Sequence, residues 1–426
     1  MIFNLFNSSR YLKTDYLKSQ IFQIYNGGFP VLFRKINTLF ILTVKVSVAI
    51  GFLPAILVIR ILRPFILIRF GQLVSSRIGH YAANTELYMC ERDVGIQPQK
   101  AIDFFLNAKP PICNKQLYLM WNRVLRINKA TIFFYVANKL IPGGKKHTIS
   151  VSCSDRDVHN LYERVPLHLK FTEKEERKGY IELKKMGIPQ NAKFILFHSR
   201  SSEYLKTVYK NRDCSYHNYR DSDINNFIRA VESLAERDYY VIRMGATPEK
   251  ALSLNNSHII DYASLYRTEF MDIFLGAKCQ FYIGDSCGIN AIPYIFRKPV
   301  ASTNFLPLEY AFTWGSNDMF IPKKHWLENE KRFMTFSEIF NSGAGRFMTT
   351  QQFEQAGISL LENSPEEIAA LAVEMDDRLQ GIWKSTEEDE KLQERFWCLF
   401  PKSELHGKIF SRIGTEFLRQ NQELLK

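Results

Sequence analysis

Four short apolar segments in the middle of the chain, separated by helical ones, constrain the fold more than any other feature of the sequence. They cover residues 194–200, 239–245, 259–262 and 279–283. The helical segments between them place apolar residues at intervals of three and four. Strands that alternate with helices in this way build a parallel sheet with helices on both faces. The sequence therefore predicts a doubly wound α/β domain in this part of the chain.

Charged and small polar residues stand where these four segments end. In chain order, the ends are Arg200, residues 243–245, residues 261–262 and residues 284–286. In a parallel sheet all four ends lie on one edge, where ligands of such sheets bind. Arginine suits phosphate because its planar guanidinium donates two parallel hydrogen bonds. Arg200 and Arg243 therefore indicate a pyrophosphate site, although solvated strand ends or structural ion pairs would give the same pattern.

The turn at residues 284–288 joins the strand 281–283 to an apolar helical segment at 289–296. It consists of Gly284, Asp285, Ser286, Cys287 and Gly288. A turn of small residues at the carboxyl end of a strand leaves backbone N–H groups free at a helix start, which is a position that binds phosphate. An ordinary turn without a ligand could have the same sequence. The two arginines expected on the same edge favour a nucleotide-phosphate role for residues 285–288.

Residues 65–91 have the order strand, glycine-containing loop and helix, which is typical of the opening of a doubly wound domain. The expected strand is 65–70, the loop runs from Gly71 to His80, and the helix covers 81–91. A histidine that faces a cleft from such a loop can act as a general base, since it titrates near neutral pH. We therefore take His80 as the candidate catalytic base, with a structural or solvated histidine as the alternative.

A long polar loop follows the strand that ends in the first of the two arginines, and its length indicates a functional role. The loop is rich in Tyr, Arg and Asn, and Tyr204 is its first aromatic residue. The pairs Asp155/Asp157 and Asp221/Asp223 have a spacing that could hold a metal ion. Helix capping or solvation accounts for both pairs, so we predict no metal site.

The net charge of +12 is concentrated at the amino terminus. Residues 1–80 contain ten Lys or Arg and one acidic residue, Asp15, whereas the rest of the chain contains 46 basic and 43 acidic residues. Because these basic residues stand among apolar ones, they indicate an anionic membrane surface rather than nucleic acid as the partner. No other stretch interleaves aromatic and basic residues as nucleic-acid-binding motifs do.

The apolar part of this amino-terminal segment, residues 38–59, is short for a transmembrane helix. It contains Lys45 and Pro54, and its uncharged run covers only residues 46–59. A membrane span needs about 20 apolar residues. We therefore expect a helix or hairpin that lies on the membrane, with a true span and a buried core helix as alternatives. No small-residue cleavage site of a secretory signal follows.

Seven cysteines are scattered through the chain without metal-binding spacing. No pair has two residues between its members, and none lies beside a cluster of histidines that would complete a zinc site. An odd, scattered set of cysteines in a chain of 426 residues is typical of reduced thiols in a cytosolic protein.

Several short motifs together resemble a poorly characterised family of predicted bacterial glycosyltransferases associated with surface polysaccharide synthesis. The resemblance covers roughly residues 60–400. Its markers are the runs 66–69, 77–80, 86–87, 240–245, 285–288, 296–299 with Asn304, 320–323 and 362–365. Each motif is weak alone, and their combination is fairly specific. An acidic residue expected beside Arg200 is missing, because Ser201 and Ser202 stand there.

The resemblance implies the GT-B fold, with two facing Rossmann-like domains, and sugar transfer from a nucleotide-sugar donor to a lipid-linked or glycan acceptor. Transferases of this fold usually bind the donor in the carboxyl-terminal domain and need no metal, so we expect no cofactor besides the nucleotide sugar. His80 would act from the first domain, with Glu86 as a weaker candidate base. The candidate donor-binding residues are Arg200, Tyr204, Arg243, Gly245, Asp285, Ser286, Gly288 and Asn304.

The expected organisation of the chain has four parts. They are a basic and apolar membrane-associated segment at 1–62, an acceptor domain at 63–180, a donor-binding domain at 181–380, and C-terminal helices at 381–426 that could pack back on the first domain. We expect a peripheral or monotopic protein on the cytoplasmic face of the inner membrane.

Two other functions agree with the same motifs. A nucleotide-sugar epimerase of similar fold would also use a diphosphate site, but its soluble substrate requires no membrane-seeking segment. A non-catalytic membrane-associated scaffold would need no arginine or aspartate at the strand ends. We therefore expect a glycosyltransferase that builds a bacterial cell-surface polysaccharide.

Overall fold

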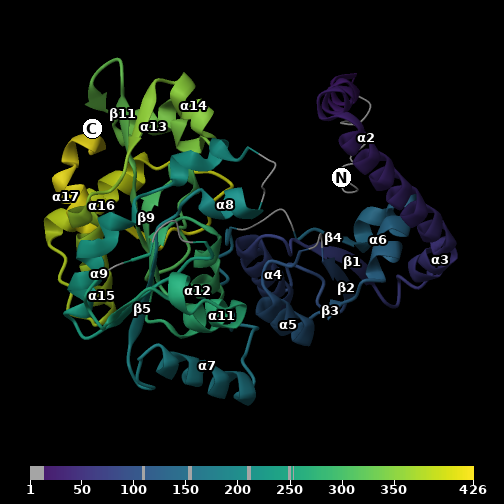
Figure 1. The fold of residues 1–426 in the computed structure, drawn as a ribbon, viewed down its shortest axis with the longest axis horizontal. Coiled ribbons are helices and arrows are strands. Elements are labelled where there is room, and N and C mark those ends of the chain that lie inside the picture. Colours follow the sequence, from purple (N-terminus) through teal and green to yellow (C-terminus); the bar gives the residue numbers. More distant parts are fainter. Residues whose placement is uncertain (1–13, 108–110, 152–155, 209–212, 248–250, 253) are drawn as a thin grey trace. The chain divides into compact units, whose positions relative to one another are not determined.

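The computed structural model describes residues 14–107, 111–151, 156–208, 213–247, 251–252 and 254–426. These residues form two compact units, each with its own sheet (Figure 1). Unit 1 comprises the described residues within Met1–Leu73, Pro98–Ala108 and Leu125–Val151. Unit 2 comprises those within Val74–Gln97, Lys109–Val124 and Ser152–Lys426.

Unit 1 is built on a four-stranded parallel sheet. The strands are β1 (Ile68–Leu73), β2 (Ile102–Asn107), β3 (Arg126–Ile127) and β4 (Thr148–Ile149), in the order β3-β2-β1-β4. A buried ion pair joins the two central strands, because the Arg69 guanidinium donates to both Asp103 carboxylate oxygens, at 2.8 Å and 3.0 Å. Each charge thus has a partner, without which its burial would be costly.

Three helices, α2 (Thr14–Gly51), α3 (Leu53–Ile61) and α6 (Thr131–Leu140), complete unit 1. Ala49 of α2 and Ile56 of α3 are buried in one cluster with Phe70 and Leu106 of the strands. Other residues of α2 and α3, among them Phe40 and Ile61, remain exposed. The amino-terminal segment therefore contributes to the core on one side and presents apolar surface on the other.

No single described helix is both long and apolar enough to cross a membrane. The bent pair Gln20–Gly51 and Leu53–Ile61, with 47° between its parts, meets the length and composition requirement together. Within α2 the backbone is non-helical at Gly28, where φ is 57°, and Pro30 follows. The segment is therefore a kinked helix followed by a short second helix.

Unit 2 is built on a seven-stranded sheet in which every pairing is parallel. Its strands are β5 (Phe194–His198), β6 (Tyr240–Arg243), β7 (Ile259–Ile260), β8 (Tyr282–Asp285), β9 (Val300–Phe305), β10 (Met319–Pro322) and β14 (Arg412–Ile413), in the order β14-β10-β9-β8-β5-β6-β7. The four strands predicted between residues 194 and 285 are neighbours in this sheet. The prediction of a parallel α/β domain is confirmed.

Helices cover both faces of this sheet. Successive residues of a strand point to opposite faces: Ile195 and Phe197 join one core cluster, whereas Phe194 and Leu196 join another. The helices of the first cluster include α9 (Ile228–Ala235) and α15 (Pro365–Leu379), and those of the second include α7 (Glu173–Lys185) and α11 (Glu269–Lys278). Burial on both sides explains the continuous apolar runs of the strands.

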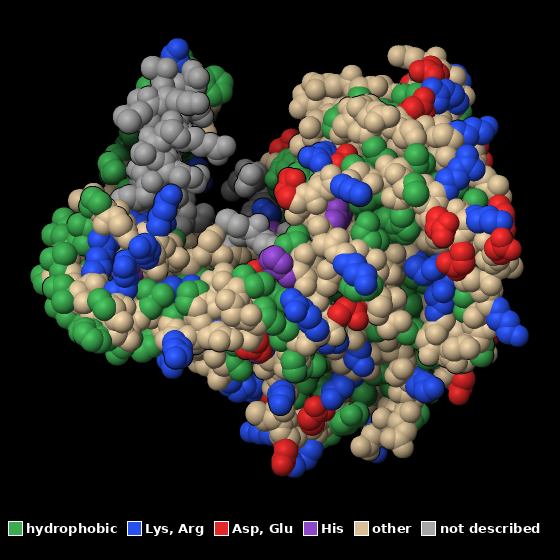
Figure 2. All heavy atoms as spheres, turned by 180° about the vertical axis from the view of Figure 1, so that it is seen from behind, with side chains coloured by type: hydrophobic (Ala, Val, Ile, Leu, Met, Phe, Trp, Pro, Cys, Tyr) green, Lys and Arg blue, Asp and Glu red, His purple; other side chains and the backbone are tan. Residues whose placement is uncertain are grey.

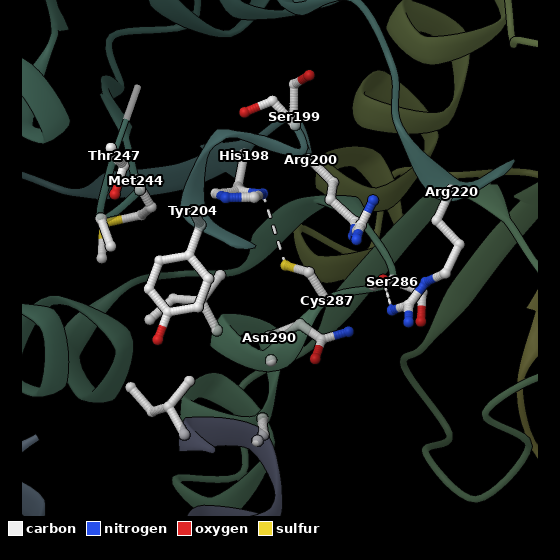
Figure 3. Close-up of a pocket in the computed structure, with 18 of the residues that line it drawn as sticks. His198, Ser199, Arg200, Tyr204, Arg220, Met244, Thr247, Ser286, Cys287 and Asn290 are labelled. Carbon is white, nitrogen blue, oxygen red and sulfur yellow. Dashed lines mark hydrogen bonds between the residues drawn. The ribbon is translucent and has the colours of Figure 1, made fainter. Parts of the chain in front are cut away.

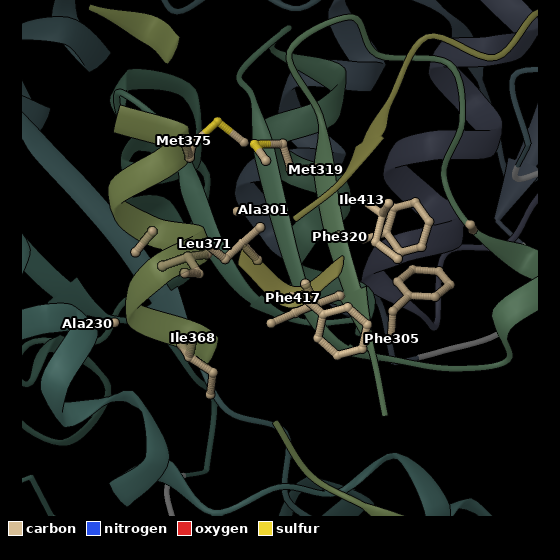
Figure 4. Packing of buried hydrophobic residues seen from close by; sticks show 14 of the residues in the cluster. Ala230, Ala301, Phe305, Met319, Phe320, Ile368, Leu371, Met375, Ile413 and Phe417 are labelled. Carbon is tan, nitrogen blue, oxygen red and sulfur yellow. The ribbon is translucent and has the colours of Figure 1, made fainter. Parts of the chain in front are cut away.

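Figure 4 shows how the first cluster is packed. Ile368, Leu371 and Met375 lie at helical spacing along α15 and face the sheet. Phe396 of α16 (Glu387–Leu399) and Phe417 of α17 (Thr415–Gln420) are buried in the same cluster. From the sequence, these C-terminal helices could pack back on the first domain. Their phenylalanines instead anchor them in the core of unit 2.

The remaining elements of unit 2 are a second, smaller sheet and further helices. A small antiparallel sheet has the order β12-β11-β13, with β11 (Lys324–Leu327), β12 (Arg332–Phe333) and β13 (Ile358–Leu361). The other α-helices are α4 (Ile78–Asp93), α5 (Lys115–Val124), α8 (Glu203–Val208), α10 (Tyr262–Leu265), α12 (Ala291–Ile295), α13 (Phe336–Asn341) and α14 (Thr350–Gln355). α15 begins with a capping box that Ser364 and Glu367 form.

Helices α4 and α5 belong to unit 2, although we expected residues 63–180 to form one domain. α4 packs on α12, and α5 packs on α11. Asn114, just before α5, donates to the Glu269 carbonyl at 2.8 Å, and Arg297 donates to the Glu86 carboxylate of α4 at 2.7 Å. These contacts join residues that are distant in the sequence, so local periodicity does not predict them.

The first strand of the sheet and the helix after it begin and end at other residues than we predicted. β1 covers Ile68–Leu73 rather than residues 65–70, and α4 begins at Ile78 rather than at residue 81. His80 consequently lies in the first turn of α4 and not in a loop.

Gly71 does not end the first strand but lies inside it. On either side of this strand lie β2 and β4. A Cβ at this position would lie 2.8 Å from the Phe105 ring and 2.9 Å from the Ile149 side chain. Glycine therefore lets the neighbouring side chains pack over the strand. The role of Gly71 is close packing within the strand, whereas we expected it to begin the loop that follows the strand.

The strand order of unit 2 reverses between β5 and β8. From β5 the chain continues to β6 and β7 on one side, and then to β8, β9 and β10 on the other. The loops that leave β5 and β8 at their carboxyl ends diverge there, and open α/β sheets bind ligands in such a crevice. β5 ends at His198 and β8 ends at Asp285. The edge selected from the sequence thus lies at this reversal.

Candidate functional site

A pocket of about 890 Å³ opens at the carboxyl ends of β5, β6 and β8 (Figure 3). All of its lining residues belong to unit 2. They come from the ends of the strands, the segment after α8, the turn before α12 and the first turn of α4. Of the predicted site residues, the pocket is lined by His80, Arg200, Tyr204, Arg243, Gly245, Ser286 and Gly288, but not by Asp285 and Asn304.

Arg200 follows β5 and is buried in the pocket wall. Its guanidinium donates to the Asp221 carboxylate and, at 3.2 Å, to the His217 carbonyl. Burial lowers the pKa of Arg200, and the nearby charge of Arg220 lowers it further. The carboxylates of Asp221 and Asp285 offset these effects only in part. The surroundings of Arg200 therefore favour a ligand that brings more negative charge.

Arg220 ends the 3-10 helix η2 (Ser215–Arg220) and reaches the turn after β8. It donates to the Ser286 carbonyl, which carries no net charge. Its Nε is buried and has no hydrogen-bond partner in the described part of the chain. A buried donor without a partner is rare in folded proteins. Arg220 therefore has donor capacity that a ligand can use.

Asn290 offers a second donor of the same kind. It ends the 3-10 helix η4 (Gly288–Asn290) and is 3% exposed. No described residue accepts a hydrogen bond from its Nδ2. Figure 3 shows the Asn290 amide and the guanidinium groups of Arg200 and Arg220 turned toward the same part of the pocket, beside Ser286. This set of donors suits an anion with several oxygens, such as a diphosphate.

Arg243, at the end of β6, lines the pocket but belongs to an ion pair. Its guanidinium lies 3.3 Å from the Asp261 carboxylate, and both residues are buried. Asp261 also accepts from the Leu252 amide at 2.8 Å. The structural ion pair that the sequence left open as an alternative thus accounts for Arg243.

Gly245 and Tyr204 line the pocket as predicted from their places in the chain. Gly245 has a φ of 153°, which glycine tolerates, and a Cβ there would lie 3.8 Å from the His198 ring. Tyr204 is exposed on α8. An exposed aromatic ring beside an anion site can stack on a planar base.

Asp285 and Asn304 lie in a buried network behind the pocket. The Asp285 carboxylate accepts hydrogen bonds from the Arg200 amide at 2.8 Å, from the Ser222 hydroxyl, and from Thr303 and Asn304 at 3.0 Å each. Asn304 also exchanges two hydrogen bonds with the backbone and side chain of Asn363, at 2.6 Å and 2.7 Å. We expected both residues to contact a ligand. They instead tie the ends of β5, β8 and β9 together.

The turn after β8 meets α4 through two glycines. A Cβ on Gly79 would lie 3.0 Å from Gly288 Cα, and a Cβ on Gly288 would lie 3.2 Å from the Gly79 amide nitrogen. A side chain at either position would crowd the backbone opposite, so glycine favours this close approach. It brings the first turn of α4, with His80, beside the turn where the sequence predicted phosphate binding.

His80 lines the pocket from this first turn. Its Nδ1 lies 3.3 Å from the Asn84 Oδ1, one helical turn further along α4. When Nδ1 donates its proton to this oxygen, Nε2 is the nitrogen that can accept another one. The arrangement is therefore compatible with a general base.

Glu86, the weaker candidate base, is absent from the pocket lining. Its Oε1 accepts from Arg297 at 2.7 Å and lies 3.1 Å from His168 Nδ1. With Cys90 and His168 it forms the one group of described residues whose spacing could hold a metal ion. The Arg297 guanidinium also lies 3.5 Å from Cys90 Sγ. A cationic side chain thus already occupies this position, and the group is an ion-pair network.

The aspartate pairs with metal-like spacing have other roles. Asp223 caps the helical turn that follows it, as predicted, whereas Asp221 pairs with Arg200. Asp157 accepts from two backbone amides of its own loop. Asp155 lies outside the described residues.

The lining residues that were not among the predicted site residues include His198, Arg220, Cys287 and Asn290. His198 Nδ1 and Cys287 Sγ lie 3.5 Å apart. Burial raises the pKa of the Cys287 thiol, but His198, Tyr282 and the Ile289 amide together outweigh burial and lower this pKa to about 7. Burial lowers the pKa of the His198 imidazole, but Cys287 and Asp285 together outweigh burial and raise it. The sequence carried a signal for this pair, since His198 stands near the end of one predicted strand and Cys287 in the turn after another.

No protein-family model and no curated protein matches the chain. Among solved structures it is similar to a glycosyl transferase family 9 protein from Veillonella parvula DSM 2008, with 9% identity, 74% of this chain and 98% of that chain covered, and a TM-score of 0.45. It is also similar to ADP-heptose LPS heptosyltransferase II from E. coli, with 12% identity, 55% and 84% covered, and a TM-score of 0.31. A third similarity is to the iron-containing dodecameric glycosyltransferase TibC from enterotoxigenic E. coli H10407, with 11% identity, 57% and 60% covered, and a TM-score of 0.30.

Proposed function

We propose that this chain is a glycosyltransferase, which moves a sugar from a nucleotide-sugar donor to a lipid-linked or glycan acceptor in bacterial cell-surface polysaccharide synthesis. The observation that supports this most is the set of donors formed by Arg200, Arg220 and Asn290 at the strand-order reversal of unit 2. The diphosphate of a donor would accept hydrogen bonds from all three side chains.

The electrostatics of the pocket favour a diphosphate over a neutral ligand. The positive charges of Arg200 and Arg220 lie close enough for one to lower the pKa of the other. An anion that contacts both guanidinium groups removes this repulsion. When the bond between sugar and diphosphate breaks, negative charge accumulates on the leaving diphosphate, and fixed cations stabilise that charge.

In the proposed reaction His80 removes the proton from the acceptor hydroxyl. His80 lies in the same pocket, and the contact of Gly79 with Gly288 holds its helix against the proposed donor site. Histidine is well suited to this role because its ordinary pKa is close to neutral pH. His80 is the histidine that α4 contributes to the described pocket, and His198 and His217 line it from other elements.

Unit 1 would hold the enzyme on the cytoplasmic face of the inner membrane, as a peripheral or monotopic protein. Apolar side chains are exposed on α3 and just beyond it, where Ile61 is 73% exposed and Phe65 is 86% exposed. Figure 2 shows hydrophobic side chains beside basic ones in this part of unit 1. Apolar side chains enter the lipid interface, and basic ones attract anionic headgroups. Membrane binding would bring the enzyme to a lipid-linked acceptor.

A transfer assay with a panel of nucleotide sugars and a lipid extract tests the proposed reaction directly. Sugar that appears in the lipid or glycan fraction supports the glycosyltransferase. A free nucleotide sugar converted to its epimer would indicate the epimerase. A protein that binds no nucleotide sugar and converts none would be the scaffold.

Replacing Arg220 with methionine is expected to weaken the binding of nucleoside diphosphates about 10- to 100-fold. Methionine keeps an apolar stem but removes the charge and the donors that would face the diphosphate. Isothermal titration calorimetry with UDP, GDP and ADP measures the change on the wild type and the variant. Asn290→Ala is expected to weaken binding in the same direction, because it removes the unpartnered amide donor.

Arg229→Met is the matched control for this experiment. Arg229 lies on α9, does not line the pocket, and forms an exposed ion pair with Glu366 at 2.6 Å. Its loss should leave the affinity unchanged. Unaltered affinity in both Arg220→Met and Asn290→Ala would show that nucleotides bind elsewhere.

Replacing Ile61 with aspartate is expected to reduce cosedimentation of the full chain with vesicles that contain anionic lipid. The carboxylate would enter the lipid interface in place of an apolar side chain, and it would repel anionic headgroups. The matched control is Ile181→Asp on α7 of unit 2, where the isoleucine is 57% exposed. The control should sediment like the wild type. Equal sedimentation of both variants would exclude this end of α3 as a membrane contact.

A further inference from the structure

Cys287 and His198 form a pair that the proposed sugar transfer does not use. Cys287 follows β8 and is half-buried in the pocket wall. Its Sγ lies 3.5 Å from His198 Nδ1 and 3.6 Å from the Tyr282 hydroxyl. Figure 3 shows the cysteine and histidine side chains pointing toward each other inside the pocket.

The backbone holds this pair in place. His198 of β5 is in register with Gly284 of β8. A Cβ on Gly284 would lie 2.2 Å from the His198 carbonyl oxygen. Glycine therefore lets the two strand ends approach closely, and the cysteine three residues later reaches the imidazole. The short distance follows from the sheet and not from a flexible side chain.

An imidazole beside a thiol favours transfer of the proton from sulfur to nitrogen, because the thiolate and the imidazolium attract each other. Tyr282 keeps its own proton, since burial raises its pKa well above the ordinary value, and its hydroxyl can donate to the thiolate. The other charged groups that face the pair are Asp285, which stabilises the imidazolium, and Arg200, which opposes it. The balance of these groups leaves the pKa of Cys287 near 7.

Cys113 shows what the imidazole adds. It lines the same pocket and is also half-buried. Burial raises the pKa of Cys113 to about 12. Two thiols of similar exposure in one pocket thus have different pKa values. The histidine beside Cys287 accounts for the lower value.

We propose that Cys287 is a modification site, at which small electrophiles and low-molecular-weight disulfides react with this chain inside the pocket. With a disulfide, the Cys287 thiolate attacks one sulfur, a new S–S bond forms as the old one breaks, and the departing thiolate takes the electron pair and a proton from His198. With iodoacetamide, an S–C bond forms and iodide leaves.

Modification has a consequence for the ligand of the pocket. Cys287 lies between Ser286 and Gly288, in the turn where the proposed diphosphate binds. An adduct on its sulfur occupies space in that turn, so the modified chain no longer binds the donor. This consequence rests on the proposed function, whereas the reactivity of Cys287 does not.

The test is alkylation of the full chain by iodoacetamide at pH 6.5, with mass spectrometry to measure the rate at each cysteine. Cys287 is expected to react about five times faster than the exposed Cys398, because the thiolate is the reactive form. Its rate should rise as the pH increases through about 7. In His198→Gln this midpoint should move up past that of an ordinary thiol, about 8.5, because burial then raises the pKa of Cys287 without the opposing histidine.

The comparison of alkylation rates among the cysteines of the wild type needs no variant. It therefore tests the proposal even where His198→Gln does not fold. Faster labelling of Cys398 or Cys113 than of Cys287 at pH 6.5 overturns the proposal. An unchanged midpoint in a folded His198→Gln variant overturns it as well. Cys287→Ser identifies the labelled peptide.

A second arm separates this proposal from the proposed function. UDP, GDP or ADP at saturation should slow the labelling of Cys287 and leave that of Cys398 unchanged. If none of the three binds in calorimetry while Cys287 still reacts fastest, the proposed function fails and the modification site stands. If a nucleotide binds equally well to alkylated and untreated chain, the exclusion of ligand by the adduct is overturned.

Discussion

Replacing Asp285 with alanine is expected to lower the free energy of unfolding by about 4 kcal/mol. The carboxylate is buried and accepts hydrogen bonds from the Arg200 amide, the Ser222 hydroxyl, Thr303 and Asn304. Alanine would leave these donors buried without an acceptor, and each such group costs about 1–3 kcal/mol. Urea unfolding followed by circular dichroism and tryptophan fluorescence measures the loss.

Thr303→Val is the matched control for Asp285→Ala. It removes a single donor, the hydroxyl that lies 3.0 Å from the Asp285 carboxylate, and it keeps the size of the side chain. Its expected loss is about 1 kcal/mol. If Asp285→Ala cost no more than Thr303→Val, the network would not be what holds the strand ends together. Because the Arg200 amide is one of the four donors, Asp285→Ala should also weaken nucleotide binding.

Replacing His80 with alanine is expected to lower kcat for sugar transfer about 1000-fold. The variant would lack the group that takes the proton from the acceptor hydroxyl, but it would keep Arg200, Arg220 and Asn290. Donor affinity measured by calorimetry should therefore remain that of the wild type. Steady-state kinetics with saturating donor and acceptor gives kcat. Added imidazole should restore part of the lost rate, because it can enter the space of the missing ring.

His159→Ala is the control for the loss of a histidine outside the pocket, and it should leave kcat unchanged. Near-normal turnover of His80→Ala would place the base elsewhere. A large loss of donor affinity in His80→Ala would indicate a structural role for the histidine in α4 rather than proton transfer.

The parallel sheet of unit 2 could be predicted because its determinants are local. Each strand is a short apolar run, and each helix has an apolar period of three and four residues, so both types are visible in windows of about ten residues. The start of α15 is determined just as locally, since the capping box of Ser364 and Glu367 lies within four consecutive residues. The division into units could not be predicted, because α4 and α5 join unit 2 through partners such as Glu269 and Arg297, far along the chain.

The edge of the sheet that carries the pocket was predicted, but the roles of individual residues on it were not. Asp285 and Cys287 stand in the same turn, and only the structure shows that one is buried behind the pocket while the other lines it. Arg220 had only the general signal of the long polar loop, and Asn290 had none, because neither residue ends a strand. Arg243 had the expected position, and its partner Asp261 decides its role. Side-chain direction and pairing depend on tertiary packing, which a single sequence does not display.

The contact between Gly79 and Gly288 also has a consequence for synthesis on the ribosome. The two residues are about 200 positions apart, so at about 5–20 residues per second the intervening chain takes roughly 10–40 s to make. Until then α4 has emerged without α12, the helix on which it packs. The nascent chain therefore carries exposed apolar surface for tens of seconds. Its yield in a cell depends on chaperones and on translation speed as well as on the stability of the finished fold.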